Sequence, residues 1–185
     1  MSPLFRHCLS VMMLGGILVS GPGYAAVPDD FSHWSFRAWQ TDEGLPDNSV
    51  TGVAQTSDGY LWVATYAGLL RFNGAAFEAA PLPSLFKKPI RSLLLDRRGR
   101  FWLGMDRGSV ICVESNVAIP FTSEQGLPAE RIAAMAEDGE GAIWIIYSGT
   151  LCRIKDHQIR RYTTQEGLPA GLNAWVTSDA RGALW

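Results

Sequence analysis

The sequence is poor in the residues from which catalytic and metal sites are usually built. It has three histidines and three cysteines in 185 residues, and the two histidines beyond residue 25, His33 and His157, lie far apart. It contains no G-x-S-x-G nucleophile motif and no glycine-rich phosphate loop. The formal net charge of −2 provides no general attraction for nucleic acid. We therefore predict no catalytic residue, no metal site, no cofactor and no nucleic-acid partner.

The sequence also lacks an apolar run long enough to cross a membrane. Its most apolar run, Leu9–Val19, has 11 residues, whereas a spanning helix needs about 20. The run follows a basic residue and precedes small residues at Gly23 and Ala25, which is the arrangement of a secretory signal peptide. We predict that residues 1–25 are a signal peptide and that the rest of the chain is exported.

An oxidising destination permits disulfides, and two cysteines remain after cleavage, Cys112 and Cys152. They do not fall at matching places in the repeat described next. We therefore expect two free buried thiols, with a bridge between them as the alternative.

What the sequence does have is a repeat. Four tryptophans stand 40, 42 and 41 residues apart, each preceded three residues earlier by a glycine. Three of them follow a Gly-Leu-Pro by 18 residues, and the remaining copy reads Ser-Leu-Phe at 84–86. The expected structural positions of the repeat are Gly59, Trp62, Gly99, Trp102, Gly141, Trp144, Gly182 and Trp185.

Each unit predicts four short strands separated by turns. In the first unit they are expected over 49–55, 60–66, 69–72 and 77–80, with a glycine turn between the first two. The first strands of units three and four are expected over 131–137 and 173–177. Four strands in a period of about 41 residues favour an all-β fold, and the regular period selects a β-propeller.

The stretches TDEGLPDNSVTGVAQT and DGYLWVATYAGLLRFNGAAF resemble the two-component regulator propeller repeat. The resemblance covers residues 34–185. It implies the periplasmic sensor region of a hybrid histidine kinase or of a membrane-bound diguanylate cyclase. The expected order of segments is a signal peptide (1–25), a leading segment with a closing strand (26–43), blade 1 (44–83), blade 2 (84–125), blade 3 (126–166) and part of blade 4 (167–185).

This order predicts three blades and part of a fourth, an incomplete ring, so we expect an N-terminal fragment of a longer receptor. The resemblance implies a membrane-anchored, dimeric full-length receptor that senses an extracellular ligand such as an oligosaccharide. Kinase or cyclase activity would lie in a downstream domain, and the fragment itself is expected not to be an enzyme. The alternatives are a secreted lyase-like propeller enzyme and a protein-binding scaffold.

Three features remain as candidates for binding. Trp175 stands where other units have Gly52, Ser92 and Ala134, and is predicted to contact a ligand near the axial channel, whereas the periodic tryptophans are expected in the core. The stretch EDGEG at 137–141 has some oxygen ligands of a calcium loop but lacks the closing Glu, so a solvated turn is the alternative. The third feature is a basic region that would suit an acidic polysaccharide or a solvated blade edge. Its members are Lys87, Lys88, Arg91, Arg97, Arg98, Arg100 and Arg107.

Overall fold

The computed structural model describes residues 37–82, 88–170 and 175–185. The chain divides into two compact units, residues 1–37 and 38–185. The expected signal peptide and most of the leading segment lie outside the described residues, as does Lys87. Within the described ranges, no helix is long and apolar enough to cross a membrane.

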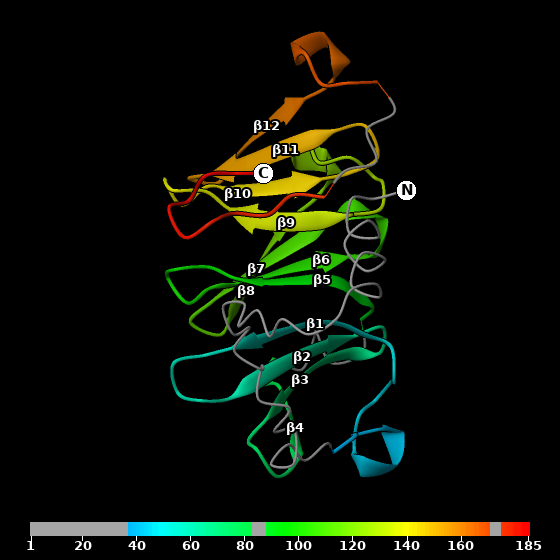
Figure 1. The fold of residues 1–185 in the computed structure, drawn as a ribbon. Helices are drawn as coiled ribbons and strands as arrows, with labels where there is room; N and C mark the ends of the chain where they lie inside the picture. The colour runs from blue at the N-terminus through cyan, green and yellow to red at the C-terminus, as the bar shows by residue number, and fades with distance from the viewer. Residues whose placement is uncertain (1–36, 83–87, 171–174) are drawn as a thin grey trace, which may run out of the picture. The chain divides into compact units, whose positions relative to one another are not determined.

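Residues 50–162 form three four-stranded antiparallel sheets, each with its strands in chain order (Figure 1). The first sheet contains β1 (Val50–Gln55), β2 (Leu61–Thr65), β3 (Gly68–Phe72) and β4 (Phe77–Ala79). The second contains β5 (Ile90–Leu95), β6 (Phe101–Met105), β7 (Val110–Glu114) and β8 (Val117–Phe121). The third contains β9 (Ala134–Glu137), β10 (Ile143–Ile146), β11 (Leu151–Lys155) and β12 (Gln158–Tyr162). The all-β prediction, with four strands to a unit, is confirmed.

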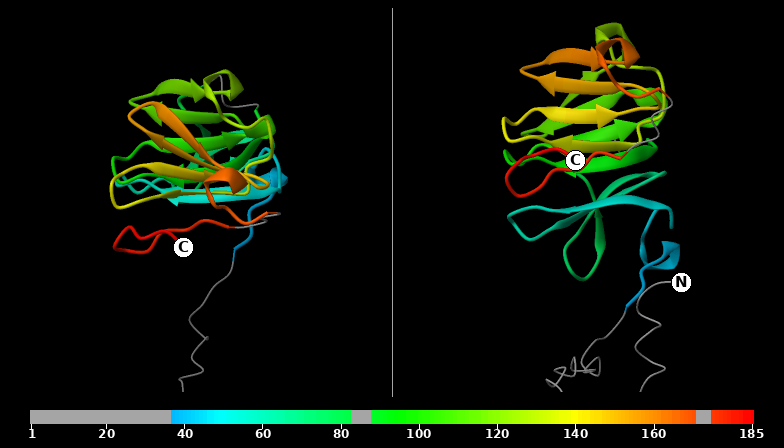
Figure 2. Two further views of the ribbon diagram at one scale, coloured as in Figure 1. Left: turned by 90° about the horizontal axis from the view of Figure 1, so that it is seen from above. Right: turned by 45° about the horizontal axis from the view of Figure 1, so that its top comes forward.

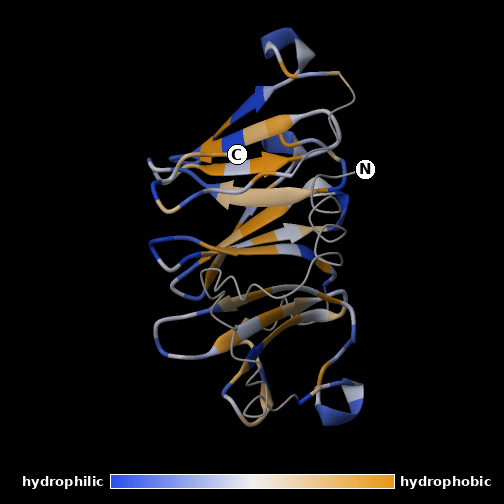
Figure 3. Cartoon of the chain, in the orientation of Figure 1, coloured by the Kyte–Doolittle hydropathy of each residue, from blue (hydrophilic) through white to orange (hydrophobic). Residues whose placement is uncertain are grey.

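The second strand of each sheet is apolar and largely buried, because neighbouring sheets cover it. All five residues of β6 are buried, and so are four of the five in β2. Figure 3 shows these hydrophobic strands flanked by hydrophilic turns. Because these strands are buried on both faces, their sequences are continuous apolar runs and do not alternate between apolar and polar residues.

Aromatic rings and close backbone contacts join the sheets. The rings of Trp62 and Phe101 lie 4.5 Å apart between the first and second sheets. Between the second and third, the Tyr147 hydroxyl donates a 2.8 Å hydrogen bond to the Gly108 carbonyl. Gly108 has φ +80°, and a Cβ there would lie 2.2 Å from the Pro128 carbonyl oxygen. Only glycine allows the two backbones to approach this closely.

The fourth unit contributes a short hairpin. Thr177 and Trp185 exchange two backbone hydrogen bonds of 3.1 and 2.9 Å, and Ser178 and Leu184 form an isolated bridge. The Gly139 N–H donates to the Gly182 carbonyl at 2.9 Å, which ties the hairpin to the third sheet. Figure 2 shows this hairpin, in red, from two further directions.

Two expected first strands differ from the structure. In the third unit β9 begins at Ala134 rather than at residue 131, because Ile132 turns toward the second sheet and packs beside Gly104. In the fourth, residues 175–177 form no strand, and residues 173 and 174 lie outside the described part. The hairpin is held by the few backbone bonds between Thr177 and Trp185 and by the bond from Gly139 to Gly182.

The turn before each second strand is built around one hydrogen-bond acceptor. In the second sheet Asp96 Oδ1 accepts from the backbone N–H groups of Arg98 and Arg100, both at 2.9 Å. Asp96 Oδ2 accepts from Trp102 Nε1 at 2.9 Å and from Arg100 Nε at 2.7 Å. A single carboxylate thus closes the turn and orients the repeated tryptophan.

The same arrangement recurs in the other units. The Nε1–H of Trp144 donates to Asp138 at 2.7 Å, and that of Trp185 to Asp179 at 3.4 Å. In the first unit Thr56 replaces the aspartate: its hydroxyl accepts from Trp62 Nε1 at 3.1 Å. The acceptor stands six residues before the tryptophan, a position that our reading of the repeat did not single out.

The Gly-Leu-Pro segments follow a capped 3-10 turn. The turns are η3 (Thr41–Glu43), η6 (Ser123–Gln125) and η7 (Thr164–Glu166), and each has a capping box and ends at a glycine in the left-handed region. Leu45 and Leu127, after the first two, are buried. The signature Gln/Thr-x-x-Glu/Gln-Gly before Leu-Pro predicts this cap, although only the proline was used to infer a connection.

We predict that Asp96→Asn destabilises the protein by about 1–3 kcal/mol, because an amide cannot accept from both the turn and the Trp102 indole. Asp96 is 4% exposed. Asp179→Asn is the matched control in the exposed hairpin and is expected to change the free energy of unfolding little. Urea unfolding of both variants measures this. Equal effects would contradict the role assigned to Asp96.

This destabilisation should depend on pH. Burial raises the pKa of Asp96, but hydrogen bonds from Trp102 and Arg100 outweigh burial, so the folded-state pKa lies below its usual value. The ionised carboxylate therefore stabilises the fold above the unfolded pKa of about 4, and this contribution is lost as pH falls through the folded value. The free-energy difference between wild type and Asp96→Asn should shrink below about pH 4. A difference that is constant from pH 7 to pH 3 would contradict this.

We also predict that Gly108→Ala destabilises more than Gly149→Ala. Both glycines have positive φ, +80° and +75°, so both variants carry the same backbone strain. A Cβ at residue 149 meets nothing within 4 Å, whereas one at residue 108 meets the backbone of the third sheet. Thermal unfolding should show a larger loss for Gly108→Ala, and equal losses would argue against tight packing there.

Candidate functional site at the inner strands

A pocket of about 720 Å³ lies where the first strand of each sheet begins; these strands, β1, β5 and β9, are the inner strands. That volume is in the range of small-molecule sites. Its wall comes from the starts of β1 and β5, the residues before β9, and the β2–β3 and β10–β11 turns. The polar and aromatic residues that line it are Thr51, Tyr66, Arg91, Arg131, Ser148 and Trp175.

The repeat explains why these residues meet. Tyr66 and Ser148 each stand four residues after the tryptophan of their unit, as does Asp106, which lies beside the pocket. Thr51 and Arg91 each stand seven residues after the first residue of their unit. Equivalent positions of successive units gather at one end of the inner strands, and each unit contributes a different side chain.

Trp175 is 74% exposed and lines this pocket. At Gly52, the equivalent position in the first unit, a Cβ would lie 2.8 Å from the Leu93 Cβ, so a large side chain is excluded. The side chain of Trp175 is not confined in this way, since most of it is exposed. Its indole therefore offers an open aromatic face.

Arg91 is held in place at the pocket wall by two contacts. Its Nε and Nη2 lie 3.2 and 3.1 Å from Asp106 Oδ1, and its guanidinium carbon lies 4.5 Å from the centre of the Tyr66 ring. Desolvation lowers the pKa of Arg91, but contacts with Tyr66 and Asp106 outweigh it and raise that pKa above its ordinary value. The side chain is thus positioned and charged.

The remaining polar groups of the pocket differ in whether they already form hydrogen bonds within the protein. The Thr51 hydroxyl bonds the Ile90 carbonyl at 2.8 Å, and buried Tyr147, also at the wall, is committed to Gly108. Arg131 and Ser148 are exposed, and neither side chain bonds another described residue. The pocket combines aromatic faces, hydroxyl groups and guanidinium groups, which suits binding and supplies no nucleophile paired with a base.

A smaller hollow of about 260 Å³ lies between the second and third sheets, at the opposite ends of these strands. Two of its cationic side chains are held in ion pairs. Arg100 Nε lies 2.7 Å from Asp96, and Lys155 Nζ lies 2.8 Å from Glu140. Burial raises the pKa of the Cys112 thiol at its base to about 11, so the thiol is protonated and unreactive. These contacts are structural.

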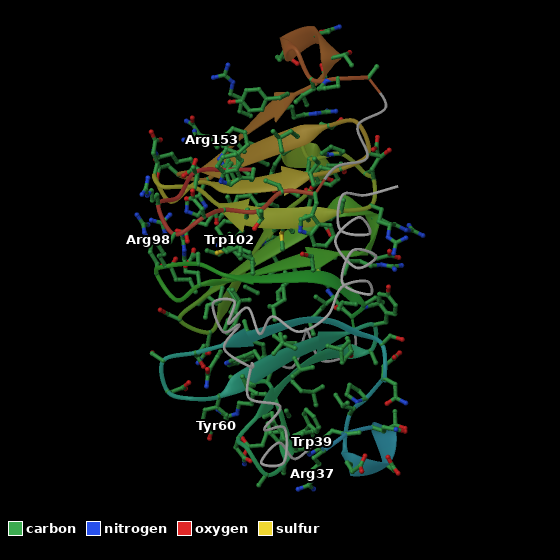
Figure 4. All side chains as sticks on the ribbon, in the orientation of Figure 1. Arg37, Trp39, Tyr60, Arg98, Trp102 and Arg153 are labelled. Carbon is green, nitrogen blue, oxygen red and sulfur yellow. The ribbon has the colours of Figure 1, made fainter. Side chains whose placement is uncertain are left out.

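The expected basic region is not one surface, and that expectation is wrong. Arg97, Arg98 and Arg100 lie at the β5–β6 turn, whereas Arg91 and Arg107 lie at the other end of the same two strands. Six strand residues separate the ends by about 20 Å. Figure 4 shows Arg98 at the outer turn, with Trp102 farther inside. Ion pairs also hold Arg97 to Glu137 and Arg100 to Asp96.

The periodic tryptophans differ in burial. Trp102 is 3% exposed, Trp62 is 9% exposed and Trp144 is half-buried, whereas Trp185 is 77% exposed. The four repeat glycines have positive φ, which the turns require; they are Gly59, Gly99, Gly141 and Gly182.

The remaining candidates can be placed directly. Cys112 and Cys152 are free and buried. Among the described residues, no group of three or more His, Cys, Asp or Glu side chains could hold a metal ion. In the stretch at 137–141, Asp138 accepts two backbone N–H bonds within its own turn, and Glu137 bonds Arg97. Arg131, Tyr66 and Arg91 were missed as pocket residues, because only the folded repeat brings them together.

Comparison with known proteins identifies the repeat. The family model described as two component regulator propeller matches residues 44–67. No curated protein sequence gives a significant match.

Solved structures share the fold at low identity. The extracellular domain of a protein described as a hybrid two-component system of B. thetaiotaomicron superposes with TM-score 0.68 and 22% identity, over 80% of this chain and 22% of its own length. That of a one-component system of the same organism gives 0.60 and 23%, over 77% and 21%. Virginiamycin B lyase of Staphylococcus aureus gives 0.59 and 19%, over 74% and 48%.

The chain thus spans about a fifth of those extracellular domains and about half of the lyase. Both the expected repeat and the expected propeller are confirmed. Residues 44–67 match the two component regulator propeller repeat, and the three sheets have the fold of β-propeller blades.

Proposed function

We propose that these blades form part of the ligand-sensing region of a bacterial transmembrane receptor and are exported to the periplasm. The observation that carries the proposal is the pocket at the inner strands, which offers binding groups in a propeller of sensor type. Sensor extracellular domains among the structural matches support it. Their greater length supports a larger sensing region in the whole protein.

The ligand that fits this pocket best is an oligosaccharide. Tyr66 and Trp175 present flat apolar faces, and hydroxyl and guanidinium groups stand beside them. Sugar rings have apolar faces edged by hydroxyl groups, so such a wall can stack on the ring and bond its rim. In a membrane-anchored dimer, ligand binding would favour one arrangement of the two receptor chains, and a downstream kinase or cyclase would respond to it.

A second candidate function is a lyase-like enzyme, because virginiamycin B lyase shares the fold. A lyase needs a general base within reach of its substrate. The described pocket residues include neither histidine nor carboxylate, and the nearest carboxylate, Asp106, is committed to Arg91. Binding without turnover is the function that these residues support.

The decisive experiment measures binding of the purified protein to an array of bacterial and plant oligosaccharides. We predict that Trp175→Ala lowers affinity at least tenfold, because it removes the open aromatic face. The matched control is Trp185→Ala, since Trp185 is equally exposed but lies outside the pocket. Equal loss in both variants, or no binding by wild type, would contradict the proposal, and conversion of a bound sugar would favour the lyase.

A further inference from the structure

The pocket is uneven in charge. Among the described residues, two arginines line it, Arg91 and Arg131, and no aspartate or glutamate does. The chain as a whole carries slightly more acidic than basic residues, so a wall of this composition does not follow from an excess of arginine. A local positive field at a concave surface attracts anions and raises their local concentration.

Arg91 is built into the wall as a fixed cation. The Asp106 carboxylate and the Tyr66 ring hold it from two sides, which reduces the rotamer entropy lost when a ligand binds. Asp106 accepts from only part of the five-donor guanidinium, so further donors remain for a ligand. The Asp106 side chain is 54% exposed, and solvent therefore screens the neutralising effect of this carboxylate.

Arg131 supplies the second charge from another element. It precedes β9, is exposed, and has no hydrogen bond or ion pair with any described side chain. Several arginines elsewhere on these blades are held in ion pairs: Arg71 with Glu78, Arg97 with Glu137 and Arg153 with Glu140. An unpaired arginine at a pocket that already holds a fixed arginine is poised for a ligand anion.

We propose that the ligand of this pocket is an acidic oligosaccharide, whose carboxylate or sulfate group is bound by Arg91 and Arg131 while its ring lies against Tyr66 and Trp175. The inference rests on the proposed sensing function and adds the charge of the ligand. A guanidinium group recognises two or more anionic oxygens on one group, and both carboxylate and sulfate provide them. Asp106 acts as a positioning residue that holds Arg91 toward the pocket.

The test uses paired probes that differ only in charge. Uronic-acid oligosaccharides are compared with the same oligosaccharides after reduction of the carboxyl groups, and sulfated oligosaccharides with their unsulfated parents. We expect wild type to bind acidic members at least tenfold more tightly than their neutral partners. The preference should weaken as salt is raised from about 0.05 to 0.5 M, because salt screens an exposed charge pair. If the uronic-acid pair shows the larger difference in affinity, the bound group is a carboxylate; if the sulfated pair does, it is a sulfate.

Substitutions show which residues bind the anionic group of the ligand. Arg131→Gln should lower affinity for the acidic probe at least tenfold more than it lowers affinity for the neutral partner, and Arg131→Lys should restore part of the acidic binding. Asp106→Asn should loosen Arg91 and lower acidic binding by a smaller factor. The control is Arg98→Gln, since Arg98 has no side-chain partner among the described residues but lies at the opposite strand ends. Thermal unfolding of each variant checks that it is folded.

The outcomes separate the two proposals. Trp175-dependent binding of neutral sugars with no acidic preference would overturn this inference and leave the sensing function in place. Acidic binding that Arg98→Gln reduces as much as Arg131→Gln does would also overturn it, because a general surface effect would be responsible. Absence of binding to every sugar would contradict both proposals.

Discussion

The hydrogen bond between each repeated tryptophan and the turn six residues before it is the interaction on which the blades depend. A carboxylate at that place satisfies two backbone donors of the turn and the one polar atom of the indole. The tryptophan can then be buried between two sheets without leaving a donor unpaired. Asp96 and Trp102 show this at full burial, with Arg100 as a further donor. Turn, strand register and inter-sheet packing are thereby fixed together.

The contacts between sheets follow from this fixed geometry. Because the strands are held in register, glycines allow close approach at two junctions: Gly108 meets the loop before β9, and Gly139 meets the turn at Gly182. Arg97 adds a polar clamp, since its backbone N–H and its side chain both reach Glu137. The inner ends of the sheets then converge, and the pocket forms from positions that are equivalent in the repeat.

The sequence reveals the repeat, the fold class and most strands, because spacing of tryptophan, glycine and proline encodes local turns directly. It does not reveal which residue accepts the hydrogen bond from the tryptophan indole. One of the four units uses Thr56 there instead of aspartate, so the position is not uniform among the units. The late start of β9 depends on Ile132 packing against another sheet, which no local pattern carries. Arg91, Tyr66 and Arg131 are 65 residues apart at the extremes, so only the folded arrangement makes them neighbours. The expectation of one basic region was wrong for a similar reason. Its arginines are close in sequence but lie at opposite ends of one β-strand.

The equivalence of Tyr66, Asp106 and Ser148 has an evolutionary consequence. These positions stand at the same place in three units, yet one is aromatic, one acidic and one a hydroxyl, while the turn acceptors and tryptophans that hold each unit stay nearly the same. Residues that face the pocket can therefore change singly without disturbing the frame. Such a molecule can acquire a new ligand through a few point substitutions, and its units can be duplicated without redesigning the scaffold.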